Sequence, residues 1–330
     1  MRFGLFVPQG WRHDLVTIDP AQHWEVMNGI AQHADSNELW ESIWVYDHFH
    51  TVPIPSDQAT HEAWTLMSAF AAATKRVRLG QMCTCMSYRN PAYLAKVATT
   101  VDIVSGGRIE MGIGGGWYEH EWRAYGYGFP EIGERLGRLR EGVEIMKQAW
   151  TTGTATLDGQ YYQVDGALFH PQPLQKPGIP FWISGGGETV TLKIAAQYAQ
   201  YTNFDGSPAG FAHKSEVLKR HCDKLGTDFD AITRSANYNV MIGDSQADID
   251  AQLDALEKRV RPFLGEKTDG FIGEYRSENA LAVGTPEQVV ERLRGLSDAG
   301  LGYAIFYFPD AAFSLDAVKR FESEVLPHLK

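Results

Sequence analysis

The chain has 330 residues, of which 44% are hydrophobic and 22% charged, and its formal net charge is −11 at pH 7. This composition is that of a globular protein large enough to bury an extensive core. The negative charge argues against nucleic acid or an anionic membrane as the main partner. No apolar run approaches the roughly 18 residues of a membrane-spanning helix, and the N-terminus lacks a signal-peptide pattern, so we expect a cytoplasmic protein.

Eight segments have the apolar, β-branched pattern of buried strands. In chain order they are residues 2–7, 42–46, 77–82, 108–113, 181–184, 201–204, 235–242 and 301–308. Helical patterns lie between and after them, at residues 20–33, 61–74, 91–104, 131–150, 188–198, 209–225, 246–260, 286–299 and 312–329. Strands that alternate with helices, without a linker between halves, predict an α/β fold: a (β/α)8 TIM barrel forming a single domain over residues 1–330.

Two segments interrupt this rhythm. Residues 151–180 contain Asp158-Gly159 between two β-rich runs, which predicts a β-hairpin inserted between the fourth and fifth strands. Residues 261–280 are less periodic and carry glycine and charge, so we expect a surface excursion there.

Active sites of TIM barrels lie at the C-terminal ends of the strands. The second strand ends in Asp47-His48, where a buried run gives way to an acid beside an imidazole. This pair either begins a loop or delivers catalytic groups. A metal site assembled from His48, Cys83, Cys85 and His120 is conceivable, but none has a recognised metal-ligand spacing, and we expect free thiols and no metal ion.

Two glycine-rich stretches also follow strands. Ser184-Gly185-Gly186-Gly187 stands between a strand and a helix, where backbone N–H groups can approach a phosphate; the alternative is a tight turn. The other stretch, residues 112–116, lacks the register of a dinucleotide fingerprint, which argues against NAD. Its Gly114 and Gly115 instead leave a strand end bare, so that a planar ring could lie against the backbone. Trp117 comes next and is the better pocket candidate, whereas Trp44 and Trp122 are expected in packing.

Taken together, these pieces resemble the luciferase-like oxidoreductases, specifically the branch that uses the deazaflavin coenzyme F420. The stretches that carry the resemblance span nearly the whole chain; they are residues 4–10, 44–49, 88–92, 105–108, 112–117, 184–188 and 283–287.

The resemblance implies a cofactor ring held near Asp47 and His48, with His48 as the acid/base. It places a non-prolyl cis peptide near Met82-Cys83 and the phosphate-bearing tail on Ser184, Gly185 and Gly186, next to Gly187. It also implies hydride transfer between C5 of F420 and a small organic substrate, and a homodimer.

Two departures from the sugar-phosphate dehydrogenases of this branch argue against glucose 6-phosphate as substrate. Trp117 replaces a glutamate, and the position of their tryptophan beyond the Asp-His pair falls near Val52. We expect Trp117, Val52 and His120 on the substrate side of a more apolar pocket. The alternatives are an FMN-dependent monooxygenase of the same fold using reduced flavin and O₂, a cofactor-binding protein without turnover, and a metal-dependent hydrolase.

Overall fold

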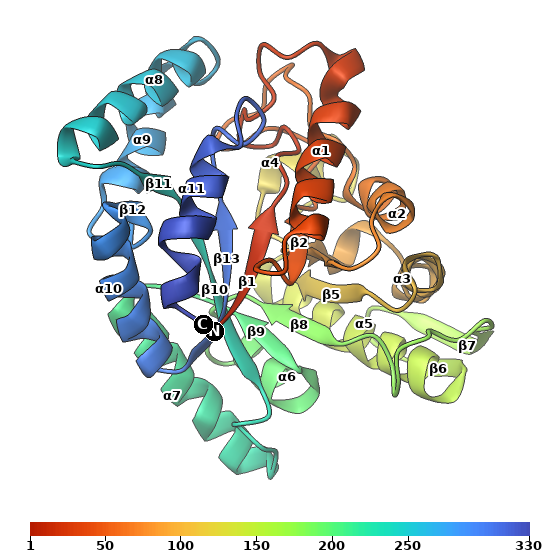
Figure 1. The fold of residues 1–330 in the computed structure, drawn as a ribbon. Coiled ribbons are helices and arrows are strands. Elements are labelled where there is room, and N and C mark those ends of the chain that lie inside the picture. Colours follow the sequence, from red (N-terminus) through yellow and green to blue (C-terminus); the bar gives the residue numbers. More distant parts are fainter. The chain divides into compact units, whose positions relative to one another are not determined.

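A computed structural model describes residues 1–330, which form two compact units. Unit 1 comprises residues 1–61, 204–213 and 234–330, and unit 2 comprises residues 62–203 and 214–233. Each unit is built around a parallel sheet flanked by helices (Figure 1).

The sheet of unit 1 has the strand order β2–β1–β13–β10. Its strands are β1 (Arg2–Phe6), β2 (Ser42–Val45), β10 (Thr233–Asn239) and β13 (Leu301–Tyr307). Gly4 in β1 lies opposite Ser42 on one side and Ile305 on the other, so the C-terminal ends of β1, β2 and β13 lie at the same edge. All four residues of β2 are buried, as expected for a parallel strand covered on both faces.

The helices of unit 1 begin where the sequence provides caps. Asp19 accepts a hydrogen bond from the Ala21 backbone at 3.0 Å, and Thr285 and Gln288 form a capping box. The helices are η1 (Pro20–Gln22), α1 (His23–Ser36), α8 (Gln246–Leu264), η3 (Gly265–Lys267), α9 (Thr268–Arg276), α10 (Pro286–Asp298), α11 (Asp316–Glu324) and η4 (Leu326–His328). The two chain termini lie side by side (Figure 1), and the Met1 amino group donates to the Leu329 carbonyl at 3.4 Å.

The excursion expected at residues 261–280 is mostly helical. It contains the end of α8, η3 and α9, and α9 packs against α8 (Figure 1). Phe271, Ile272 and Tyr275 of α9 are buried in a cluster with α8 and the small parallel sheet of β11 (Met241–Ile242) and β12 (Val283–Gly284). Glycine and charge weakened the helical signal, but the spacing of these three apolar side chains fits one buried helix face.

The sheet of unit 2 has the order β3–β5–β8–β9, and the short β4 also pairs with β5. Its strands are β3 (Arg78–Gln81), β4 (Thr84–Cys85), β5 (Ile109–Gly114), β8 (Phe181–Ser184) and β9 (Tyr201–Asn203). The accompanying helices are α2 (Ala63–Ala73), η2 (Met86–Tyr88), α3 (Pro91–Ser105), α4 (Glu119–Ala124), α5 (Ile132–Thr152), α6 (Thr191–Tyr198) and most of α7 (Pro208–Leu225). The two units thus supply the eight parallel strands expected from the sequence.

The predicted hairpin is present as the antiparallel pair β6 (Thr154–Asp158) and β7 (Gln163–Leu168), beside α5 (Figure 1). Its turn is longer than the two residues predicted. The Glu141 carboxylate accepts hydrogen bonds from the backbone N–H groups of Gln160, Tyr161 and Tyr162 at 3.0, 2.9 and 3.0 Å, which stabilises the wider turn. None of the helices combines the length and apolar character needed to cross a bilayer.

Candidate functional site

In unit 1, Asp47 and His48 follow directly on the buried strand β2 and are themselves 3% and 9% exposed. The strand end is held by the fully buried Gln9, which follows β1. Its side-chain N–H donates to the carbonyls of Tyr46 and His61 at 2.6 Å each, and its Oε1 accepts from the Tyr46 N–H at 2.7 Å. Gln9 therefore joins the ends of β1 and β2 and fixes the backbone from which Asp47 and His48 extend.

The His48 ring is the end of a series of aromatic contacts, which we call the aromatic column: Phe6, Tyr46, Trp11 and His48. Phe6 and Tyr46 stack with centroids 4.4 Å apart, and Tyr46 meets Trp11 at 3.9 Å. Trp11 in turn lies parallel to His48, with an interplanar angle of 2° and centroids 4.8 Å apart. The imidazole is thus held by a ring face as well as by its backbone.

Val52, expected on the substrate side, is 5% exposed and supports Trp11 through the backbone. Its N–H donates to the Trp11 carbonyl at 2.7 Å, and the following Val52-Pro53 peptide is cis. The structure therefore brings Val52 to the aromatic column.

A charged cluster that sequence reasoning missed lies next to the column, after β1, with Asp14 buried and Glu274 exposed. Asp14 accepts hydrogen bonds from the Gly10 N–H at 2.6 Å and the Tyr307 hydroxyl at 2.9 Å, and Arg12 pairs with Glu274 of α9 at 2.7 Å. Burial raises the pKa of the Asp14 carboxyl above its ordinary value, although the hydrogen bonds oppose this shift. The signal in the sequence was the run 12–14, three consecutive titratable residues in the loop that follows β1.

His13, within the same run, is fully buried and has a left-handed backbone with φ of 59°. Burial lowers the pKa of its imidazole to about 4, and the nearby Arg12 cation acts in the same direction, while the Val52 carbonyl opposes them. This histidine is therefore neutral at physiological pH.

In unit 2, the predicted cis peptide is present at Met82-Cys83. The Ser184 hydroxyl donates to Met82 Sδ at 2.9 Å. A Cβ added to Gly114 would stand 2.7 Å from Cys83 Sγ and 3.2 Å from the Ser184 carbonyl oxygen. The structure thus gathers these four predicted residues at the ends of β3, β5 and β8, with no room for a side chain at Gly114.

The neighbouring Gly115 faces a helix rather than a strand: a Cβ added to it would lie 3.1 Å from the Leu136 side chain of α5. After Gly116, whose φ is +74°, Trp117 turns outward with 60% of its surface exposed and stacks on Tyr118 at 5.3 Å. His120, on α4, lies 6.1 Å from the Tyr118 ring. Trp117 and His120 therefore flank one tyrosine on the surface of unit 2, whereas Trp44 and Trp122 are buried, as expected.

The glycine loop 184–187 connects β8 to the turn before α6. Gly185 has φ of +119° and donates its N–H to the Asn203 carbonyl at 2.8 Å, which leaves little freedom for another residue. Lys214 of α7 lies over the loop: a Cβ on Gly186 would meet Lys214 Cε at 3.3 Å, and Lys214 Nζ pairs with Glu188 at 2.6 Å. The sequence had not marked this lysine, which places a cation beside the predicted phosphate loop.

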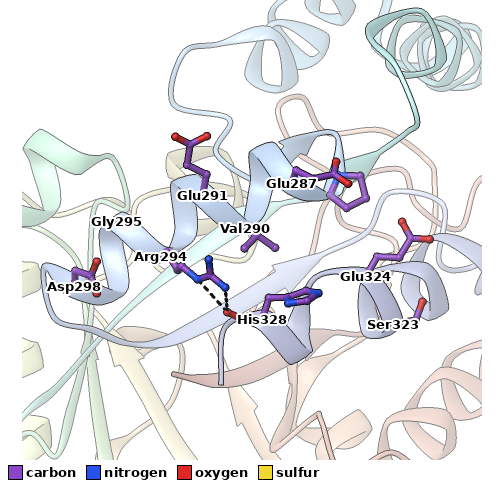
Figure 2. A pocket seen from close by; sticks show the side chains of 10 residues that line it. Glu287, Val290, Glu291, Arg294, Gly295, Asp298, Ser323, Glu324 and His328 are labelled. Atoms are coloured by element: carbon purple, nitrogen blue, oxygen red, sulfur yellow. Dashed lines mark hydrogen bonds between the residues drawn. The ribbon is translucent and has the colours of Figure 1, made fainter.

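A groove of about 830 Å³ lies in unit 1 along α10 and the C-terminal residues, and none of the predicted site residues lines it. Figure 2 shows its side chains, which include Glu287, Glu291, Arg294 and His328. Arg294 donates to the His328 carbonyl at 3.1 Å, so that cation stabilises the end of the chain. No three His, Cys, Asp or Glu side chains are grouped in a metal-binding arrangement.

Comparison with known proteins gives the same fold and adds the family. The structure of an F420-dependent secondary alcohol dehydrogenase in complex with an F420–acetone adduct superimposes with a TM-score of 0.78 at 19% identity, covering 100% of this chain and 99% of that one. The fold is therefore the predicted (β/α)8 TIM barrel with an inserted hairpin. The profile of the luciferase-like monooxygenases matches residues 1–302, and the chain belongs to that family as a luciferase-like oxidoreductase.

Two relatives are similar over most of the chain. One, named F420-dependent glucose-6-phosphate dehydrogenase, from Kineococcus radiotolerans, is 36% identical and covers 88% of this chain and 89% of its own. A protein of the same name from Gordonia bronchialis is 26% identical and covers 97% of each chain. The family predicted from the ordered motifs is confirmed.

Proposed function

We propose that this protein is an F420-dependent oxidoreductase that transfers a hydride between C5 of the deazaflavin and a small organic substrate. The observation that carries the proposal is His48, buried at the end of β2 beside Asp47 with its ring plane held by Trp11. The resemblance to proteins named for F420, over 88% and 97% of this chain, supports the choice of cofactor.

The residues of unit 2 fit the two chemically different parts of such a cofactor. Gly114 has no side chain, which lets Cys83 and the Ser184 carbonyl pack closely against this strand end beside Met82, and we propose this packed surface as the backing of a planar ring. The loop 184–187 offers backbone N–H groups and has Lys214 beside it, as a phosphate-bearing tail requires. We propose that Gly114, Gly115, Met82 and Cys83 hold the ring, and the loop with Lys214 holds the tail.

The bound deazaflavin would supply the hydride chemistry, and the protein would supply position and proton transfer. A ring nitrogen of His48 gives the substrate a proton or takes one, since an imidazole can do both near neutral pH. Asp47 orients the imidazole or holds the cofactor ring from the same strand end. The low exposure of both side chains keeps bulk water from competing for the proton.

We further propose an organic substrate less polar than a sugar phosphate. Trp117 is apolar where the sugar-phosphate dehydrogenases of the resemblance carry a glutamate, and Val52 is smaller than the tryptophan that falls near its position. Trp117 exposes a large aromatic face, and His120 contacts the same tyrosine. Alcohols and activated alkenes or ketones are the matching substrate classes.

The test has two stages. The purified protein is first titrated with F420 and with FMN, following absorbance and fluorescence quenching. It is then assayed with oxidised F420 and 2-propanol, and with reduced F420 and 2-cyclohexen-1-one. Binding of F420 and a change at its absorbance band with either substrate are expected.

His48→Ala should lower turnover by about 10²–10⁴-fold while F420 binding persists. His328→Ala, in η4 of the same unit and exposed, is the matched control and should leave turnover unchanged. Full turnover by the His48→Ala variant would refute the assigned role.

The second candidate is an FMN-dependent monooxygenase, because the matching family is described as luciferase-like monooxygenases. It predicts tighter binding of FMN than of F420 and consumption of O₂ when reduced flavin is added. Tight F420 binding with negligible FMN binding would exclude it.

A further inference from the structure

Trp11 stacks on the His48 imidazole. The two rings are parallel within 2° at a centroid distance of 4.8 Å, while Tyr46 is 6.5 Å away and inclined by 41°. A histidine ring rotates about χ2 between broad, roughly two-fold wells, so its backbone alone does not fix the direction of its nitrogens. A flat ring stacked against the imidazole favours the one orientation in which the two ring planes are parallel.

Trp11 is itself held firmly. Its carbonyl accepts the Val52 N–H at 2.7 Å, its ring packs on Tyr46, and it is 8% exposed. The preceding Gly10, with φ of +104°, could not carry a Cβ without meeting the Ala59 carbonyl oxygen. The backbone path to Trp11 is therefore fixed on both sides.

The polar atom of the indole plays no part in this support. Trp11 Nε1 is buried and makes no hydrogen bond. The indole is in ring contact with both Tyr46 and His48, and the contact that it offers His48 is a parallel stacking surface. Phenylalanine at this position would retain a smaller stacking surface and lose the N–H.

We propose that Trp11 is the positioning residue of His48: its indole face fixes the imidazole plane, so that the proton-carrying nitrogen keeps one direction toward the substrate. This inference rests on the proposed role of His48 as acid/base. An aromatic contact of this kind biases a conformational equilibrium by about two- to tenfold. Misdirecting a catalytic group can cost up to about 10²-fold in rate.

The test compares Trp11→Phe and Trp11→Leu, with Trp24→Leu as control, since Trp24 lies on α1 of the same unit and is 41% exposed. The stack is read without cofactor, from the NMR shifts of ¹³C-labelled histidine rings, with the His48 signal assigned by its loss in His48→Ala. An indole or phenyl face shifts the protons above it upfield. Thermal unfolding is recorded for every variant.

We expect Trp11→Phe to keep an upfield His48 signal and turnover within about threefold of wild type. Trp11→Leu should lose the upfield shift and lower kcat by about 10–100-fold, with the F420 dissociation constant unchanged. If Trp11→Leu does not fold, Trp11→Met, unbranched and without a ring, takes its place. The control should match the wild type in both measurements.

Equal losses in the phenylalanine and leucine variants would show that a stacking face does not carry the effect and would overturn the proposal. So would a leucine variant with undiminished kcat. A missing upfield shift in the wild type would refute the stack itself without bearing on the proposed function. Full turnover by His48→Ala, by contrast, would refute the proposed function and this inference with it.

Discussion

Replacing His13 by asparagine should reduce the loss of unfolding free energy that the protein undergoes as the pH falls from 7 to 4. The wild-type imidazole is buried, and burial lowers its pKa from 6.5 to about 4. Asparagine removes the titratable ring yet tolerates the left-handed φ of 59° better than most residues. The substitution therefore tests the protonation of one side chain with little backbone strain.

The sign follows from proton linkage. Between pH 6.5 and about 4 the unfolded state binds a proton at His13 that the folded state does not bind, so stability falls as the pH falls. The contribution is fully present above pH 6.5. A displacement of about 2.5 pH units corresponds to about 3 kcal/mol lost across this window.

The measurement is urea unfolding, followed by tryptophan fluorescence, of wild type and His13→Asn at several pH values from 7 to 4. Other groups titrate over this range in both proteins, so the informative quantity is the difference in unfolding free energy between them. That difference should change by about 3 kcal/mol in favour of the variant as the pH falls.

His328→Asn, at an exposed position, should run parallel to the wild type. A difference between wild type and His13→Asn that stays constant within about 1 kcal/mol from pH 7 to 4 would show that His13 is protonated in the folded state, and would refute the reasoning.

Three further substitutions probe unit 2. Gly114→Ala places a Cβ 2.7 Å from Cys83 Sγ and should weaken F420 binding by tenfold or more in a fluorescence titration, whereas Gly29→Ala, where a Cβ meets nothing within 4 Å, should bind normally. Lys214→Ala should weaken F420 binding by about tenfold but leave binding of a deazaflavin without the phosphate tail unchanged; equal losses for both ligands would contradict the assignment. Arg108→Ala should lower the unfolding free energy by about 3 kcal/mol or more in urea unfolding, because several buried carbonyls lose the guanidinium that donates hydrogen bonds to them. A loss under about 1 kcal/mol would be inconsistent with these hydrogen bonds.

Arg108 illustrates the limits of sequence reasoning. The run 105–108 was recognised as part of a family resemblance, without a reason for the arginine. In the structure its guanidinium donates to the carbonyls of Ala71, Thr74 and Val77 at 3.0, 2.8 and 2.6 Å, joining the end of α2 to the start of β5. These acceptors are 31 to 37 residues away from Arg108 in the chain, and no local sequence pattern predicts the contacts.

Local pattern did predict the strands, because a buried parallel strand requires a continuous apolar run, and β8 matched its predicted bounds of 181–184. It missed the helix α9, where Gly270 and Gly273 masked a buried face formed by Phe271, Ile272 and Tyr275. Helix formation there is decided by packing against α8, which sequence spacing alone does not reveal.

In the candidate site, too, local sequence identified some residues and not others. Asp47 and His48 were found because an acid and an imidazole follow an apolar strand. Trp11 and Lys214 were not found, because the contact that makes each relevant is with a residue distant in sequence. Trp11 stacks on His48, and Lys214 lies beside Gly186.

Exposure separates the residues proposed for chemistry from Trp117, one of the residues proposed for substrate selection. Asp47 and His48 are 3% and 9% exposed, while Trp117 is 60% exposed on a surface segment before a short helix. A substitution at Trp117 disturbs little packing, so its cost to folding is small. The sequence at this position can therefore drift, and with it the range of accepted molecules, while the strand that carries the proton-transfer group stays unchanged. Directed evolution aimed at new substrates should begin at Trp117 and leave β2 alone.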